Sequence, residues 1–320
     1  MIPRVLIADL PSPVERLPRL STALGGPQLW VKRDDLTGLA FGGNKTRKLE
    51  FILAEAQANG ARTLITVGAA QSNHCRQVAA LAARVGLGCI LVLSGDPSMS
   101  TSGNLFLDRL FKAEIVWTSH DERSEVLKRT FENAWADGRR PYLIPLGASN
   151  TTGTLGYTYA FDELMQQSVN PGWIVLASSS GGTQAGLILG ARRAGWQGKI
   201  LGISIDEPAS LLRKTVAGLA SDASERFGEK IPFQADDVLI NDNYLGGGYG
   251  VMGDLELRAI QLFAQQEGLL LDPVYTGRAA GALIDLIYKG FFKPEETVLF
   301  WHTGGTPALF AEPYLNQLNS

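Results

Sequence analysis

Short runs of apolar and β-branched residues recur along the chain, and each is followed by a segment with apolar residues at helical spacing. Two such helices, 48–60 and 76–86, end at a glycine, which is a common helix stop. Strands that are apolar throughout and alternate with helices are typical of parallel sheets covered on both faces. The pattern predicts an α/β fold with strands at 63–67, 89–94, 142–146, 173–178, 200–205 and 297–302.

The alternating units divide into two groups. Residues 49–153 could form a sheet of their own, and polar, glycine-rich connections border them at 41–48 and 147–157. The short, turn-rich segment before them cannot form a domain alone. We predict a small domain at 49–153 and a large domain made of 1–48 and 154–320. The ligand is expected in the cleft between them, where strand ends converge.

Composition narrows the function classes. Apolar residues make up 45% of the 320 positions, and the net charge of −3 comes without a Lys/Arg-rich run, so neither nucleic acid nor a membrane is an expected partner. No apolar stretch of about 18 residues predicts a membrane span, and the first residues lack signal-peptide features. We expect a cytoplasmic protein with Cys75 and Cys89 as buried free thiols. The histidines lack metal-ligand spacing and no GxSxG motif is present, so no metal site is expected.

The segment 42–51 (GGNKTRKLEF) carries the first candidate chemistry. The pair Gly42–Gly43 permits a sharp backbone path, and Asn44 can cap the helix that follows. Lys45 would then project from the first helical turn, where the positive helix end and desolvation lower its pKa toward the free amine that Schiff-base chemistry needs. Lys48 lies on the same face of the helix and could meet a phosphate.

Two further clusters follow predicted strands and open predicted helices, so their backbone N–H groups can bind an anion. Ser72, Asn73 and His74 lie on the first such turn, which could bind a substrate carboxylate. The second, SSSGGT at 178–183, suits a phosphate, although it matches neither GxGxxG nor the P-loop pattern. A last group of hydroxyls stands beside glycines near element ends: Tyr249, Tyr275, Thr276 and Thr303.

Together these clusters closely resemble one enzyme family. The stretches VKRDDLTG, GGNKTRKLEF, QSNHCRQVAA, SGGTQAGL, GYGV, DPVYTG and HTGG run in the family's order from about residue 30 to 310. They resemble the D-cysteine desulfhydrase and 1-aminocyclopropane-1-carboxylate (ACC) deaminase family of fold-type-II pyridoxal 5′-phosphate (PLP) enzymes. The resemblance implies a two-lobed, tryptophan synthase β-like fold, PLP as cofactor and an amino acid as substrate. We also expect a homodimer.

The resemblance also implies a role for each candidate residue. Lys45 would form the Schiff base with PLP and Lys48 would help to hold its phosphate. Asn73 would contact the cofactor's 3′-oxygen as well as the substrate, and Ser72 and His74 would face the substrate. The phosphate loop would comprise Ser180, Gly181, Gly182 and Thr183. Tyr249 and Tyr275 match the family's two active-site tyrosines, so that the catalytic set is Lys45, Ser72, Tyr249 and Tyr275. Thr276 and Thr303 would lie near the pyridine nitrogen.

The reaction within this family depends on few positions. Ring-opening deaminases resemble this chain but carry Glu where Thr276 stands, and a hydroxyl gives a weaker electron sink than a carboxylate. His74, where deaminases tend to have Gln, also favours the desulfhydrase branch. Gln184 and the SSSGG loop depart from the usual desulfhydrase pattern. We predict α,β-elimination of D-cysteine to pyruvate, hydrogen sulfide and ammonia. The alternatives are an L-cysteate sulfo-lyase, an ACC deaminase and a non-catalytic PLP-binding protein.

Overall fold

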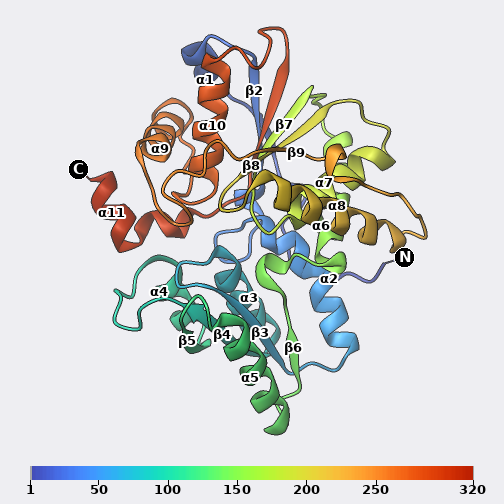
Figure 1. Cartoon of the computed structure of the whole chain (residues 1–320), viewed down its shortest axis with the longest axis vertical. Coiled ribbons are helices and arrows are strands. Elements are labelled where there is room, and N and C mark those ends of the chain that lie inside the picture. The colour runs from blue at the N-terminus through green and yellow to red at the C-terminus, as the bar shows by residue number, and fades with distance from the viewer. Residues whose placement is uncertain (1, 320) are drawn as a thin grey trace.

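The computed structural model describes residues 2–319, which form two β-sheets covered by helices (Figure 1). The larger sheet is parallel apart from its antiparallel edge strand β1. Its strands, in order across the sheet, are β1 (Val14–Arg16), β2 (Gln28–Arg33), β10 (Thr297–His302), β7 (Trp173–Ser178), β8 (Lys199–Ser204) and β9 (Leu239–Asn241). The smaller sheet is entirely parallel, in the order β5 (Glu114–Thr118), β4 (Gly88–Ser94), β3 (Thr63–Ala69) and β6 (Pro141–Leu143).

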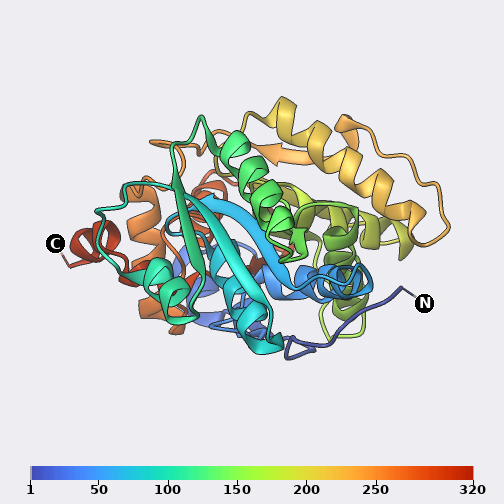
Figure 2. The ribbon, with the colours of Figure 1, turned by 90° about the horizontal axis from the view of Figure 1, so that it is seen from below.

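Helices cover both faces of both sheets, because strands buried on two sides need an apolar partner on each. Two apolar clusters flank the larger sheet, one with α1 (Pro18–Leu24), α9 (Asp254–Glu267) and α10 (Thr276–Tyr288), the other with α6 (Thr151–Met165), α7 (Gly182–Arg193) and α8 (Ala209–Glu225). On the smaller sheet, one face packs against α2 (Asn44–Ala58), α3 (Asn73–Val85) and α4 (Gly103–Leu110), and the other against α5 (Arg123–Ala136). The remaining helices are α11 (Glu312–Leu318) and the 3-10 turns η1 (Asp34–Leu36), η2 (Leu146–Ala148), η3 (Ala235–Asp237) and η4 (Thr306–Phe310). Seen from below, the first described residues and α11 lie on opposite sides of the molecule (Figure 2).

The predicted α/β architecture with parallel sheets is confirmed. Each predicted strand is present, although the segment 142–146 contributes only the short β6. The prediction missed β1, β2, β5 and β9. β2 escaped the search for apolar runs because it ends in Lys32 and Arg33, and the Lys32 side chain is nevertheless fully buried beside Glu163 (2.5 Å). The strands of the smaller sheet all lie within 49–153, but the bounds of the two domains stay a prediction.

A buried charge network fixes α2, the helix that carries Lys45, against the larger sheet. Arg47 forms a bidentate pair with Asp34 at 2.8 and 3.0 Å, and Tyr157 and Trp301 also donate to this carboxylate. Burial opposes ionisation, but the Arg47 charge lowers the pKa of Asp34 to about 2. Since removal of one partner would leave an uncompensated buried charge, the network holds α2 in a single position.

Candidate active site

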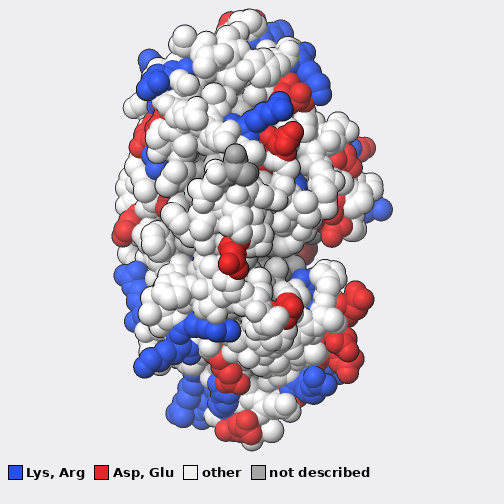
Figure 3. All heavy atoms as spheres, turned by 90° about the vertical axis from the view of Figure 1, so that its left-hand side faces the viewer, with Lys and Arg blue, Asp and Glu red and all other residues white. Residues whose placement is uncertain are grey.

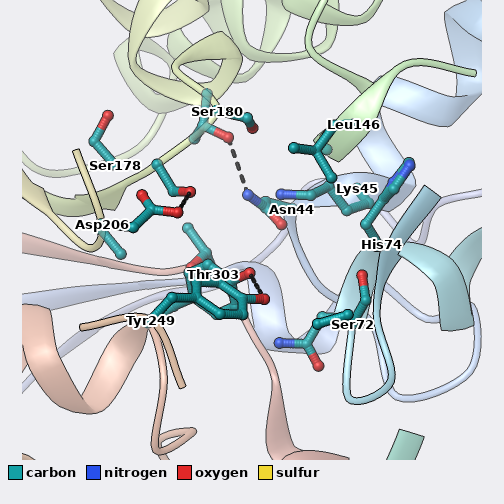
Figure 4. A pocket seen from close by; sticks show the side chains of 18 of the residues that line it. Asn44, Lys45, Ser72, His74, Leu146, Ser178, Ser180, Asp206, Tyr249 and Thr303 are labelled. Atoms are coloured by element: carbon teal, nitrogen blue, oxygen red, sulfur yellow. Dashed lines mark hydrogen bonds between the residues drawn. The ribbon is translucent and has the colours of Figure 1, made fainter. Parts of the chain in front are cut away.

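A cavity of about 560 Å³ lies where the carboxyl ends of strands from both sheets meet (Figure 4). The residues at or just after the strand ends that line it are Ala69, Ser94, Ser178, Asp206 and Thr303. Its volume is within the roughly 300–1,000 Å³ that is usual for small-molecule sites. Parallel strands direct their carboxyl ends to one edge of a sheet, which explains why residues distant in sequence converge here.

Lys45 lies in the first turn of α2, and its side chain lines the cavity. The N-cap residue Gly43 has φ 123°, a conformation that favours glycine, and the backbone N–H of Asn44 donates to the carbonyl of Thr303 (3.0 Å). Burial lowers the pKa of Lys45 to about 8, although the charge of Asp272 acts in the opposite direction. The amine is therefore partly neutral near pH 8, which is the form that attacks a carbonyl carbon.

The prediction that Asn44 caps this helix was wrong. The helix begins at Asn44 itself, and no side chain caps its start. The Asn44 amide instead donates from Nδ2 to Oγ1 of Thr183 (3.0 Å), which lies in the first turn of α7. This bond links the start of α2 directly to the start of α7, so the Lys45 turn and the loop before α7 are held in a fixed relation.

The loop between β7 and α7 brings the start of a helix to the cavity. Its N-cap residue Gly181 has φ 80° and no side chain, and the backbone N–H of Gly182 donates to Oγ of Ser149 (3.3 Å). Ser180, Gly181 and Thr183 line the cavity, whereas Gly182 does not. A helix start concentrates partial positive charge and N–H donors, which is the arrangement that binds phosphate groups.

Lys48 is a buried cation on the far side of this loop. Its Nζ donates to the carbonyl of Gly147 (3.2 Å) and to Oγ of Ser149 (3.1 Å), and a Cβ added to Gly182 would lie 3.0 Å from it. Lys48 forms no ion pair with any residue from 2 to 319, and burial, assisted by the Lys45 charge, lowers its pKa well below the usual value. A buried ammonium without a counter-ion is costly, so this end of the cavity fits an anionic ligand.

The start of α3 faces the cavity from the smaller sheet. Ser72 is the N-cap, and its Oγ accepts a hydrogen bond from the backbone N–H of Cys75 (3.2 Å). His74 contacts Oγ1 of Thr66 through Nε2 (2.7 Å), and its Nδ1 has no partner among the described residues. Burial lowers the pKa of His74 well below its usual range, so the ring is neutral. With Asn73, these side chains give the cavity a neutral, hydrogen-bonding wall.

Two tyrosines meet on the opposite wall. The hydroxyls of Tyr249 and Tyr275 are 2.7 Å apart, and both side chains line the cavity. Burial raises the pKa of both hydroxyls, and for Tyr275 the neighbouring Tyr249 adds to the effect. Both therefore carry their protons near neutral pH and are available as proton donors.

Thr276 and Thr303 differ in what their hydroxyls contact. Thr276 is fully buried outside the cavity lining, and its Oγ1 donates to the buried carboxylate of Asp272 (2.8 Å) and accepts from the Asp272 backbone N–H (2.7 Å). Thr303 lines the cavity and its hydroxyl has no partner among the described residues. The direct contact with the cofactor ring implied for Thr276 stays a prediction.

Comparison with known proteins assigns the chain to a family. A family model described as pyridoxal-phosphate dependent enzyme matches residues 5–304. The chain belongs to the PLP-dependent enzyme family. Its cofactor is therefore PLP, and the anion-binding loop, the buried Lys48 and the amine of Lys45 match the phosphate and the aldehyde of that molecule.

Two PLP-dependent relatives are similar along nearly their whole length. A D-cysteine desulfhydrase from Klebsiella pneumoniae (strain 342) is 43% identical over 98% of this chain and 97% of its own. A crystal structure titled as an ACC deaminase homologue superimposes with a TM-score of 0.90 at 37% identity, covering 99% of this chain and 96% of its own. A fungal L-serine ammonia-lyase from Rhizomucor miehei, with TM-score 0.67 and 17% identity over 96% of this chain and 97% of its own, shares the fold.

The structure brings most of the predicted PLP-site residues into one cavity. Those that line it are Lys45, Ser72, Asn73, His74, Ser180, Gly181, Thr183, Tyr249, Tyr275 and Thr303. Gly182 belongs to the loop but does not line the cavity, Lys48 lies next to Gly182, and Thr276 is bonded to Asp272 outside the lining. Their individual roles toward PLP stay predictions.

Sequence reasoning missed four charged or titratable residues of the cavity wall. His120 and Arg123 come from the smaller sheet, and Asp206 and Glu207 from the larger. The first two follow β5, a strand that the apolar pattern did not predict, so the segment after it was not searched. Asp206 follows the predicted strand 200–205 directly, and the rule that ligands bind at carboxyl ends could have found it.

Within residues 2–319, no group of three or more His, Cys, Asp or Glu side chains could hold a metal ion. Cys75 and Cys89 are free and buried, as predicted. Over the same described range, none of the helices has the length and apolar character needed to cross a membrane.

Proposed function

We propose that this PLP-dependent enzyme is a carbon–sulfur lyase that converts D-cysteine and water to pyruvate, hydrogen sulfide and ammonia. The observation that carries the proposal is the 43% identity, along nearly the full length of both chains, to a D-cysteine desulfhydrase. The convergence of Lys45, the glycine-rich loop before α7, the start of α3 and the tyrosine pair on one cavity supports it.

In this proposal the cofactor is held at four points: its aldehyde carbon, its phosphate, its phenolic oxygen and its ring nitrogen. Lys45 binds its aldehyde carbon, while Lys48 and the loop residues Ser180, Gly181, Gly182 and Thr183 hold its phosphate. Asn73 would contact the phenolic oxygen. Thr303, which lines the cavity, would lie near the ring nitrogen together with Thr276. When bound, PLP supplies an electron sink for the negative charge that develops at the substrate Cα.

The chain's own residues bind the substrate and move its protons. The backbone N–H groups at the start of α3, with Ser72 and His74, bind the substrate carboxylate. The Lys45 amine, with its lowered pKa, takes the Cα proton. The protonated Tyr249–Tyr275 pair donates a proton to the departing sulfur, so that sulfide leaves as a neutral species.

Residues of the same cavity also bear on the three alternative functions. The 37% identical structure titled as an ACC deaminase homologue keeps ACC deamination open, but Thr276 stands where the ring-opening enzymes are expected to carry Glu. The cationic Arg123 in the cavity wall keeps the L-cysteate sulfo-lyase open, because a sulfonate leaving group is anionic. A non-catalytic PLP carrier would need neither Ser72 nor the tyrosine pair.

A substrate panel tests the proposal. Purified holoenzyme is incubated with D-cysteine, L-cysteine, L-cysteate, ACC, D-serine and β-chloro-D-alanine, and keto acid and sulfide release are followed. We expect pyruvate from D-cysteine and β-chloro-D-alanine and little or no ketobutyrate from ACC. Faster turnover of cysteate or of ACC than of D-cysteine would overturn the assignment in favour of that alternative.

We further propose a homodimer in the cytoplasm. The face that carries α11 has few charged side chains over its central part (Figure 3). Exposed apolar residues lie on adjoining elements there: Phe106 and Leu110 on α4, Phe310 on η4 and Leu315 on α11. Such a patch is typical of a protein–protein interface.

Light scattering after gel filtration tests the proposed dimer. Phe310→Glu should convert the dimer to a monomer, because it places a charge in the apolar patch. A monomeric wild-type protein would contradict the proposal.

A further inference from the structure

Arg76 is a fully buried cation that does not reach the cavity but contacts two segments that do. It lies one turn into α3, and no part of its surface is exposed. Its Nη2 donates to the carbonyl of Gly42 (2.8 Å), three residues before Lys45, and its Nη1 donates to the side chains of Asn73 (3.2 Å) and Asn104 (2.9 Å). Although burial lowers the pKa of Arg76 to about 10, the guanidinium stays charged at neutral pH.

These contacts determine which way the Asn73 amide points. Its Oδ1 accepts from Nη1 of Arg76 and from Nδ2 of Asn104 (2.9 Å). Arginine has donors only, so the atom of Asn73 that faces Arg76 must be the oxygen. The Nδ2 donor of Asn73 is therefore turned the other way.

The orientation of the Asn104 amide is also fixed by its hydrogen-bond partners. Its Nδ2 also donates to the carbonyl of Gln71 (2.9 Å), which can only accept, and its Oδ1 accepts from Arg76. Neither end of this buried amide can be exchanged without loss of a hydrogen bond. Arg76 and Asn104 thus form a closed set of donors and acceptors around a single atom, Oδ1 of Asn73.

The Nδ2 of Asn73 has no hydrogen-bond partner among the described residues. It lies close to Gly305, where an added Cβ would come within 2.8 Å of it. Asn73, Thr303 and Gly304 all line the cavity, so this donor lies beside the loop that follows β10. A donor with this fixed direction fits an anionic oxygen on the ligand.

We propose that Arg76 and Asn104 are positioning residues that hold the Asn73 amide with its Nδ2 donor toward the phenolic oxygen of bound PLP. They act through Asn73 and touch neither cofactor nor substrate. The inference rests on the proposed location of PLP in this cavity. It adds that the hydrogen bond from Asn73 to the cofactor is pre-organised by two residues that do not contact the cofactor.

A double-mutant cycle on cofactor affinity tests the proposal. Apoenzyme of the wild type, Arg76→Gln, Asn73→Ala and the double variant is titrated with PLP, and the dissociation constant is read from tryptophan fluorescence. Loss of one charge-assisted hydrogen bond should weaken binding about 10- to 100-fold in Asn73→Ala, and Arg76→Gln should reach about 10-fold. In the double variant, Arg76→Gln should add less than about twofold, because its partner is already gone. Equal effects of Arg76→Gln in both backgrounds would overturn the proposal.

Two variants keep the test informative if Arg76→Gln does not fold. Asn104→Ala removes the second donor to Oδ1 of Asn73 and should show the same dependence on Asn73. Asn73→Asp keeps an acceptor toward Arg76 but has no donor for PLP, so it should bind PLP as weakly as Asn73→Ala at an unchanged thermal midpoint. Wild-type PLP affinity in Asn73→Asp would refute the role of Nδ2.

The control is Arg84→Gln on the same helix, since the Arg84 side chain donates to the carbonyl of Ile7 (3.0 Å), away from the cavity. It should leave PLP affinity unchanged, and a loss equal to that of Arg76→Gln would show a general effect of the helix. Failure of the proposed PLP location is distinguishable, because wild-type protein would then form no borohydride-reducible adduct at Lys45. Failure of the proposed D-cysteine activity would instead appear in the substrate panel, with the PLP dissociation constants of the cycle unaffected.

Discussion

α7 and α3 both begin where a buried parallel strand ends, and both direct their first turns at the same cavity. At α7 the N-cap is Gly181, which has no side chain, and Ser149 and the buried Lys48 lie behind the loop, with Oγ of Ser149 accepting from the Gly182 N–H (3.3 Å). At α3 the N-cap is Ser72, whose hydroxyl already occupies one backbone N–H, and His74 beside it is neutral.

The difference matches the two kinds of anion that a PLP enzyme binds. A phosphate that stays bound can be met by the N–H groups of a helix start and a buried lysine, since the bound anion favours the charged form of that amine for as long as it is present. A substrate that must leave is better met by a neutral wall whose donors are fixed by side chains. Variants at the two ends should therefore fail in different ways.

Removal of Lys45, which lies between the two ends, should have the largest effect. Lys45→Ala should lower the rate of pyruvate formation by more than the roughly 10²–10⁴-fold expected for a lost acid–base group, because the covalent attachment is lost as well. The α7 end should still retain PLP non-covalently. Pyruvate release, the visible spectrum and borohydride reduction measure these outcomes, with the exposed Lys128→Ala as control. A borohydride-reducible adduct in Lys45→Ala would identify another lysine.

Loss of the Tyr275 hydroxyl should come next. Tyr275→Phe should cut elimination by roughly 10²–10⁴-fold while the cofactor spectrum stays nearly unchanged, because the hydroxyl contacts Tyr249 and not the α7 loop. Steady-state kinetics measure the rate of elimination, and absorbance measures the cofactor spectrum. The matched control is Tyr244→Phe, which removes a hydroxyl bonded to Asp285 outside the cavity. Full activity in Tyr275→Phe would exclude a role in proton transfer.

Lys48→Gln should weaken the phosphate end alone. The variant removes the buried charge and should raise the dissociation constant of PLP about 10- to 100-fold, as expected for a lost charge-assisted hydrogen bond. At saturating PLP, KM for substrate should change little. Apoenzyme titration measures the affinity, with Lys128→Gln as the control for loss of a surface lysine. A raised KM with unchanged PLP affinity would place Lys48 at the substrate end.

The smallest effect is expected at the α3 end. Ser72→Ala removes a helix cap, so the free energy of unfolding should fall by about 1 kcal/mol, and KM should rise severalfold with PLP affinity unchanged. Asn150→Ala is the matched control, because Asn150 caps α6 in the same manner (2.8 Å to the N–H of Gly153) outside the cavity lining. Equal KM in both variants would reduce Ser72 to a structural cap.

Local patterns were sufficient for much of this fold and site. The apolar runs predicted the main parallel strands because strands buried on both faces need no polar alternation. The turn after Gly42–Gly43 and the loop at Ser180–Thr183 could be predicted because glycine adopts positive φ values that other residues rarely adopt, as Gly43 (φ 123°) and Gly181 (φ 80°) do. β2 and β5 were missed because their charged or partly exposed residues interrupt the apolar pattern.

By itself the sequence determined the α/β class, the position of Lys45 at a helix start and the two strand-to-helix turns before α3 and α7, since these depend on neighbours along the chain. Only the tertiary structure decided how they meet. Asn44 caps nothing and bonds instead to Thr183, 139 positions away, and Thr276 bonds to Asp272 at the back of the site. Arg76 orients Asn73 through contacts that involve Asn104, 28 positions further on. Donors and acceptors choose partners by distance in space, and that distance is set only when both sheets are packed.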